Sequence, residues 1–128
     1  MRLFGTIGGV CCFLGVVAGA LGAHALKAHL AASGGLSNFD LATGYMFYHG
    51  LALILLGIIC DRHPHRPFRI CGWLFIAGTV LFQGNLFLTS LTGSHFLSIL
   101  TPVGGLSLMA GWLLFGYFAL RTKARLDN

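Results

Sequence analysis

The stretch from residue 3 to residue 23 reads LFGTIGGVCCFLGVVAGALGA and carries no charged side chain. A helix crosses the hydrocarbon core of a bilayer with about 20 mainly apolar residues, so this stretch has the length and composition of a membrane span. Three further stretches, 41–60, 70–94 and 96–120, also hold no Asp, Glu, Lys or Arg. The sequence therefore predicts an all-α polytopic membrane protein, a four-transmembrane-helix antiparallel bundle. It forms a single integral membrane domain, 1–128, with helices at approximately 3–26, 41–60, 70–91 and 99–120.

The composition of the whole chain supports this prediction. Of its 128 residues, 56% are hydrophobic and 9% are charged, whereas soluble domains carry about 25% charged residues. The apolar runs are continuous rather than alternating, which indicates helices and not the strands of a barrel. These features exclude an ordinary soluble domain and a disordered chain, and they give no indication of nucleic-acid binding.

The basic residues predict how the chain is oriented. Short links make successive helices antiparallel, so both termini and the link 61–69 share one side of the membrane. That side holds seven of the eight basic residues, and the positive-inside rule then places both termini in the cytoplasm. The same side chains are expected to lie at the membrane surface, where they can contact anionic lipid. These residues are Arg2, Arg62, Arg66, Arg69, Arg121, Lys123 and Arg125.

The first span also resembles a secretory signal peptide in some respects. Ala23, His24 and Ala25 form an A-x-A pattern after the apolar run. A signal core usually has about 7–15 apolar residues, and the run 3–23 is longer. The sequence therefore favours an uncleaved membrane helix.

Small residues recur along the first helix at alternating steps of three and four, which places them on one face. They are Gly5, Gly8, Cys12, Gly15, Gly19 and Gly22. The fourth helix has a shorter stripe, made of Gly104, Ser107 and Gly111. Because lipid gives no hydrophobic drive for helix pairing, helices associate by close approach over such residues. We expect both stripes to seat close helix contacts, and pairing of the two stripes with each other is one arrangement they allow.

Polar side chains inside a bilayer are costly, so each is a candidate for function. His49 lies about 13 Å from the outer end of its predicted helix at 1.5 Å per residue, and Tyr45 shares its face. Gln83 and Asn85 point to nearly opposite faces of the third helix. The outer half thus gathers a candidate polar pocket, near which His29 and His95 also lie. Its residues are His24, Tyr45, His49, Gln83, Asn85 and Thr101.

Two interpretations of this cluster are open. One is a pocket that binds a metal, a haem or a small solute from the outside. The other is a set of interhelical hydrogen bonds, worth about 0.6 kcal/mol each. The sequence favours hydrogen bonding, because metal sites usually need three or four ligands and neutral histidine is often a satisfied core group.

The link after the second helix combines Cys60, His63, His65 and Cys71, residue types that zinc prefers. Their spacing is not that of a standard zinc site, and three arginines crowd the link, so a basic turn at the membrane surface is favoured. We predict no metal and no cofactor. The chain also lacks paired carboxylates, a phosphate-binding loop and a Ser-His-Asp pattern, so no catalytic residue is assigned and no enzyme is expected.

Four segments, taken in order, carry a family resemblance. They are GALGAHALK (19–27), YMFYHGLAL (45–53), LFQGNLFL (81–88) with LTG (91–93), and TPVGG (101–105) with GWL (111–113). Together they resemble the YgdD/YwdK-like family of small inner-membrane proteins, the "domain of unknown function 423" group related to transmembrane protein 256. The resemblance implies a multi-pass protein of the bacterial inner membrane and brings no catalytic residues.

The sequence therefore predicts a non-enzymatic membrane protein whose first partner is the lipid bilayer. Its small soluble fraction and glycine stripes favour a structural or accessory role in a larger membrane complex or a homo-oligomer. The alternative is a ligand-binding or permeation module around His49. A weaker third option is lipid interaction through the arginine-rich face.

Overall fold

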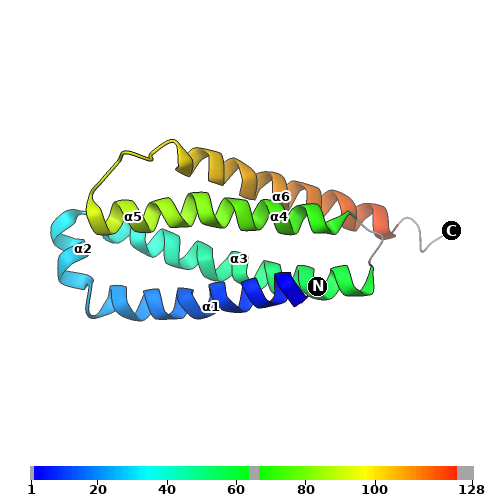
Figure 1. Ribbon diagram of the computed structural model, residues 1–128, viewed down its shortest axis with the longest axis horizontal. Coiled ribbons are helices and arrows are strands. Elements are labelled where there is room, and N and C mark those ends of the chain that lie inside the picture. The colour runs from blue at the N-terminus through cyan, green and yellow to red at the C-terminus, as the bar shows by residue number, and fades with distance from the viewer. Residues whose placement is uncertain (1, 64–66, 124–128) are drawn as a thin grey trace.

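A computed structural model describes residues 2–63 and 67–123 of the chain, with side chains up to residue 121. Four helical rods run side by side and antiparallel, and both termini lie at the same end (Figure 1). They are α1 (Arg2–Ala23), α3 (Leu36–Arg62), a rod spanning Phe68–Thr92, and α6 (Leu100–Lys123). All four rods are long and apolar enough to cross a membrane, which confirms the predicted fold class.

The third rod is built from three segments. They are α4 (Phe68–Gly78), a π-helical turn η1 (Thr79–Gln83) and α5 (Gly84–Thr92). In the π turn the Gly84 N–H bonds the Thr79 carbonyl, five residues back. Turns of this kind widen a helix locally and recur at functional sites, so the residues of η1 are candidates for a functional role.

The link between α1 and α3 is more ordered than a loop. α1 ends at Ala23, before the predicted end at residue 26. Residues 27–33 then form a separate short helix, α2 (Lys27–Ser33). Gly34 ends α2 in the left-handed region, with φ of 70°, and the Gly35 N–H bonds the Leu30 carbonyl. This backbone pattern is a Schellman cap, which explains why a glycine follows the helix. α3 then begins at Leu36, earlier than the predicted residue 41.

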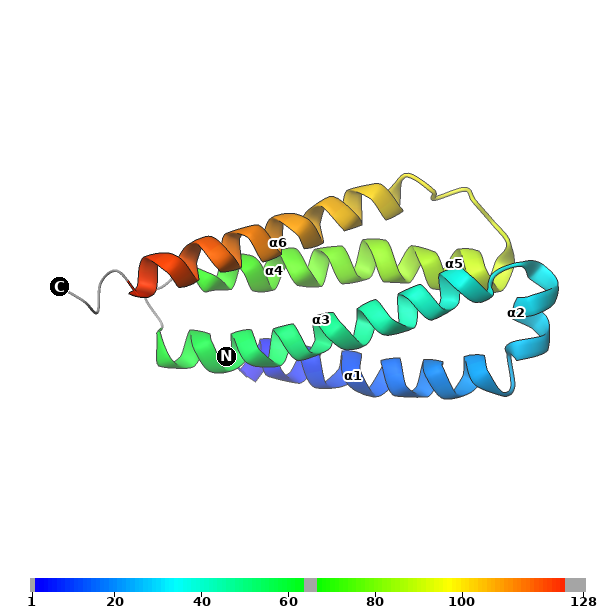
Figure 2. The same ribbon diagram turned by 180° about the vertical axis from the view of Figure 1, so that it is seen from behind.

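The four rods pack in sequence across the bundle. α1 packs along α3, α3 packs on the third rod, and the third rod packs on α6. Both ribbon views place α1 and α6 at opposite edges of the bundle (Figures 1 and 2). α3 and the third rod therefore form the centre, while α1 and α6 each present a broad outer face.

The stripe on α1 faces α3 and brings the two backbones together. A Cβ atom at Gly8 would lie 2.5 Å from the Gly50 carbonyl oxygen, and one at Gly50 would lie 2.9 Å from the Gly8 oxygen. At Gly22 a Cβ atom would lie 2.8 Å from the Phe39 ring. A side chain does not fit at these positions. We call this α1–α3 contact the glycine seam.

The members of the stripe are not equally tight. A Cβ atom at Gly15 or Gly19 would make ordinary contacts at 3.4 and 3.6 Å, and at Gly5 it would meet nothing within 4 Å. The stripe on α6 faces the third rod: at Gly104 a Cβ atom would lie 2.5 Å from the Phe82 nitrogen, and at Gly111 2.6 Å from the Phe75 ring. Pairing of the two stripes with each other is therefore wrong, because α1 and α6 occupy opposite edges.

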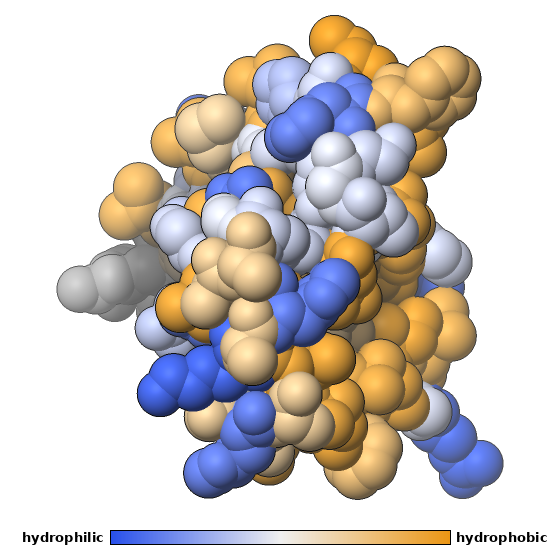
Figure 3. Space-filling model, turned by 90° about the vertical axis from the view of Figure 1, so that its left-hand side faces the viewer, coloured by the Kyte–Doolittle hydropathy of each residue, from blue (hydrophilic) through white to orange (hydrophobic). Residues whose placement is uncertain are grey.

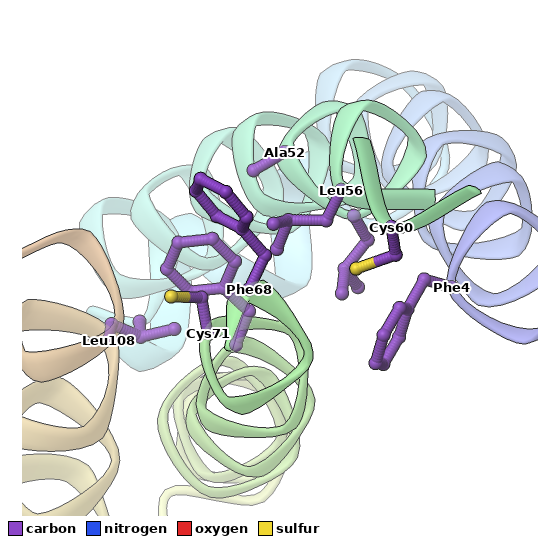
Figure 4. Close-up of a cluster of buried hydrophobic side chains, with 9 residues drawn as sticks. Phe4, Ala52, Leu56, Cys60, Phe68, Cys71 and Leu108 are labelled. Atoms are coloured by element: carbon purple, nitrogen blue, oxygen red, sulfur yellow. The ribbon is translucent and has the colours of Figure 1, made fainter. Parts of the chain in front are cut away.

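An apolar cluster fills the centre of the bundle near the termini. Phe68 and Cys71 of α4 pack with Ala52, Leu56 and Cys60 of α3, and further members reach in from the outer helices, as Figure 4 shows. Those outer members are Phe4 of α1 and Leu108 of α6. Cys60 and Cys71 thus lie among hydrophobic side chains and act as small apolar groups.

The surface matches a protein solvated by lipid. Figure 3 looks onto the α2 end, where hydrophilic side chains gather, while the flanks are largely hydrophobic. Large apolar side chains point outward along the rods, including Phe13 at 66% exposed and Leu113 at 77% exposed. The described basic residues Arg2, Arg62 and Arg121 fall at rod ends on the termini side, and Arg69 begins the third rod there. Arg66 and Arg125 lie outside the described residues, as does the side chain of Lys123.

Candidate functional site

His49 is the centre of the polar contacts inside the bundle. Its side chain is 5% exposed, and its Nδ1 atom lies 2.8 Å from the Tyr45 carbonyl oxygen one turn earlier on α3. The Trp112 indole Nε1–H of α6 donates to His49 Nε2 at 3.1 Å. The amide nitrogen of Gln83 in the π turn lies 3.4 Å from His49 Nδ1. One histidine therefore connects three of the rods.

These partners determine the tautomer of His49. An indole N–H is only a donor, so His49 Nε2 accepts and carries no proton. The proton of the neutral ring then sits on Nδ1 and is donated to the Tyr45 carbonyl. Both ring nitrogens are therefore engaged within the bundle in this neutral tautomer.

The Gln83 amide is not satisfied by this arrangement. Its side chain is fully buried, and its Oε1 atom has no hydrogen-bond partner among the described residues; the same holds for Thr79 Oγ1. Since His49 Nδ1 carries the proton, the Gln83 nitrogen faces another donor. Rotating the amide by half a turn would place Oε1 against this N–H, and amide orientation is assigned from such networks.

The network lies near the middle of α3. His49 is thirteen residues from each end of α3, because α3 runs from Leu36 to Arg62. At 1.5 Å per residue this is about 20 Å from either end. Trp112 likewise stands near the centre of α6. The sequence analysis counted from residue 41 and so placed His49 about 13 Å from the end of its helix, whereas α3 begins earlier, at Leu36.

Asn85 and Thr101 form a separate polar pair. The Asn85 amide Nδ2 donates to Thr101 Oγ1 at 2.8 Å, which joins α5 to the start of α6. Thr89 Oγ1 donates to the Asn85 carbonyl one turn away. Gln83 and Asn85 thus face different neighbours, in agreement with their predicted orientation. This pair is not part of the His49 network.

The remaining candidates of the predicted pocket are dispersed. His24 and His95 are exposed, and His29 Nε2 lies 3.0 Å from the Leu91 carbonyl oxygen, bridging α2 to α5. Tyr45 contributes its carbonyl to His49, while its ring stacks on Phe82 at 5.4 Å. Within residues 2–63 and 67–123 no group of three His, Cys, Asp or Glu side chains is placed to hold a metal ion. His65 lies outside those ranges.

Trp112 was missed by the sequence analysis. Its ring lies 4.8 Å from Phe75 and 6.0 Å from His49, and its N–H bonds the histidine. A signal was present, because tryptophan concentrates at membrane interfaces and Trp112 falls in the middle of its apolar run. An indole N–H away from water needs an acceptor, and His49 supplies it.

Comparison with known proteins agrees with the structure. A family described as "Protein of unknown function (DUF423)" matches residues 18–105. A UPF0382 membrane protein of Staphylococcus haemolyticus is 39% identical over 114 residues, covering 89% of this chain and 92% of the relative. UPF0382 membrane proteins of Staphylococcus saprophyticus and Staphylococcus aureus are 37% and 36% identical over the same share of this chain, covering 93% and 92% of their own lengths. No solved structure matches the chain.

Proposed function

The chain belongs to the DUF423 family, and on that premise we propose that it acts in the membrane without catalysing a reaction. Its role is that of a structural or accessory component, in a larger membrane complex or as a homo-oligomer. The relatives are named as membrane proteins, and nothing in their names indicates a reaction.

One observation carries this proposal: several polar side chains of the spans form hydrogen bonds between helices. His49 accepts from Trp112 and donates to the Tyr45 carbonyl, so neither ring nitrogen is free to move a proton. Asn85 is bonded to Thr101, and the Ser107 hydroxyl donates to the Leu74 carbonyl at 2.8 Å. Such bonds set the register of helices rather than performing chemistry.

The alternative role, binding of a metal or haem through His49, finds less support. Ligation requires a ring nitrogen with a free lone pair, and the only lone pair of this tautomer accepts the Trp112 hydrogen bond. A metal would have to displace the indole, and the described residues contain no group of three His, Cys, Asp or Glu side chains placed to hold it.

The two outer helices are where a partner is most accessible. A photo-crosslinking amino acid at Leu113 of α6 or at Phe13 of α1 would probe the two edges separately, since both side chains point outward. We expect a discrete protein adduct from one edge in native membranes. The mass of the complex then tells a second copy from a different subunit. Adducts with lipid alone from both edges, together with a monomer mass, would contradict the accessory role.

We also propose that both termini face the cytoplasm of a bacterial plasma membrane. The described arginines at the termini end, Arg2, Arg62, Arg69 and Arg121, support this, because basic residues are retained on the cytoplasmic side. Reporter enzymes fused to each terminus should be active only in the cytoplasm. A periplasmic or extracellular signal from either fusion would reverse the topology.

A further inference from the structure

A groove of about 530 Å³ lies between α3 and α6. It is lined by residues of both helices and of the π turn, namely Tyr45, Tyr48, His49, Phe82, Gly105, Leu108, Met109 and Trp112. Its volume falls within the range of about 300–1,000 Å³ that is usual for small-molecule sites. Tyr48 is 61% exposed and Met109 56% exposed, so the groove opens on the outer surface of the bundle.

The depth of the groove decides what can enter it. His49 and Trp112 stand near the centres of α3 and α6, so the opening faces the hydrocarbon core and not water. An occupant must therefore be dissolved in the bilayer. A free ion, a sugar or a nucleotide would have to cross hydrocarbon without its hydration shell, which is prohibitively costly.

The walls of the groove favour a flat ring. Tyr45 and Phe82 are stacked, with centroids 5.4 Å apart and an angle of 26° between their planes. Trp112 of α6 also lines the groove. Gly105 leaves room at the wall, because a Cβ atom there would meet only the Phe82 ring, at 3.6 Å. Aromatic faces of this kind pack well against another planar ring.

The hydrogen-bonding groups of the groove are uncharged donors. Both nitrogens of His49 are engaged, and none of the lining residues is acidic or basic apart from this neutral histidine. Neither Tyr45 nor Tyr48 donates its phenol hydroxyl to another described residue. In hydrocarbon an unused hydroxyl favours an acceptor such as a carbonyl oxygen.

We propose that the α3–α6 groove binds a lipid-soluble prenylated quinone. Its planar ring packs against Phe82 and Trp112, and a ring carbonyl accepts a hydrogen bond from Tyr45 or Tyr48. The isoprenoid tail remains in the surrounding lipid. A second copy of the chain fits this groove less well, because helix pairing in lipid depends on small residues, and the rim carries Tyr48, Met109 and Trp112.

The two tryptophans of the chain provide the test. Trp112 lines the groove, while Trp73 of α4 lies outside it with its ring edge-on to Phe4 at 5.8 Å. Trp73→Phe leaves Trp112 as the reporter, and Trp112→Phe leaves Trp73. The full-length variants would be placed in phosphatidylcholine–phosphatidylglycerol nanodiscs and titrated with decylubiquinone, which quenches indole fluorescence.

We expect saturable quenching of Trp112 and only a linear, collisional decrease for Trp73. Identical linear quenching of both reporters would overturn the proposal. Phospholipids with brominated acyl chains serve as the competing occupant. If they quench Trp112 and decylubiquinone does not displace them, the groove holds an acyl chain and the proposal fails.

The hydroxyl contact is tested in the Trp73→Phe background. Changing both Tyr45 and Tyr48 to phenylalanine should weaken quinone binding by roughly threefold to tenfold, as expected for the loss of one hydrogen bond. Tyr117→Phe is the matched control, because Tyr117 lies on α6 outside the groove, and it should leave affinity unchanged. Unchanged affinity in the double variant, or an equal loss in the control, would overturn the assignment of a quinone.

Discussion

Two contacts hold this bundle together by different means. In the glycine seam, Gly8 and Gly50 bring two backbones together, and Cys12 Sγ makes a long hydrogen bond across it to the Phe47 carbonyl, at 3.8 Å. At the junction of α3, η1 and α6, which we call the polar junction, Trp112 and Gln83 converge on His49. Close packing stabilises the first contact, and directional bonds specify the second.

The difference follows from what lipid can and cannot provide. Van der Waals contact between helices requires close approach, and glycine permits it. It does not by itself select one rotation when three helices meet. Hydrogen bonds are directional, so the Trp112–His49 bond selects one register for α6 on α3. The glycine seam should therefore be sensitive to added volume, and the polar junction to the loss of donors and acceptors.

The largest effect is expected in the glycine seam. Gly8→Ala would place a Cβ atom 2.5 Å from the Gly50 oxygen and force α1 from α3, at a cost of about 1–3 kcal/mol in the free energy of unfolding. Gly9→Ala is the matched control, because a Cβ atom there meets nothing within 4 Å. It should be neutral or stabilise the helix by about 0.5–1 kcal/mol. Denaturant titration of both variants in bicelles measures the difference. Equal effects would show that the seam is not tightly packed.

The glycine seam also shows how far the sequence could predict the structure. The regular spacing in the first span predicted its buried face, because helical geometry alone places those residues together. The partner glycine, Gly50, was not predicted. Which residue of α3 opposes Gly8 depends on helix register, and register depends on long-range packing. The early start of α3 was missed for a different reason. The predicted helix began at residue 41, after the charged Asp40, although a helix can extend beyond the membrane.

Two residues of the polar junction were predicted from the sequence, but Trp112 and the hydrogen bonds between the helices were not. His49 and Gln83 were identified because polar groups are rare in hydrocarbon, yet Trp112 counts as apolar in any hydropathy pattern. The π turn that widens the third rod near Gln83 has no signature in the periodicity of the sequence. The pocket that would have joined His24 and Thr101 to His49 does not form, because common depth in a membrane does not imply contact.

Trp112→Phe is expected to have the next largest effect. It removes the Trp112 donor to His49 Nε2 while retaining most of the aromatic packing, so it should cost about 0.6–1.7 kcal/mol, the average to maximum for such bonds in membrane bundles. Nitrogen NMR of the His49 side chain should show a changed Nε2 resonance and a proton retained on Nδ1. Trp73→Phe should alter neither. A proton on Nε2 in the unmodified protein would contradict the tautomer.

The Asn85–Thr101 bond should contribute less, because Thr101 is only partly buried. Thr101→Val keeps the shape of the side chain and removes the acceptor, and Asn85→Leu removes the donor. A double-mutant cycle should give a coupling energy of about 0.6 kcal/mol. The Thr92 hydroxyl donates to the Leu88 carbonyl and accepts from the Ser94 N–H, with no contact to α6, so Thr92→Val should show no coupling to Asn85→Leu. Coupling of the same size there would mean that the cycle reports general loosening of α5.

The smallest effect is expected at Gln83, although this side chain is fully buried. Its Oε1 atom has no partner among the described residues, and its nitrogen makes one long contact with His49. Gln83→Leu keeps the volume and removes a poorly satisfied amide, so the free energy of unfolding should change by less than about 0.5 kcal/mol. Gln83→Ala leaves a cavity and should cost about 2 kcal/mol or more. If leucine is instead as damaging as alanine, the amide is a fully bonded member of the polar junction, and hydrogen bonding outweighs packing there.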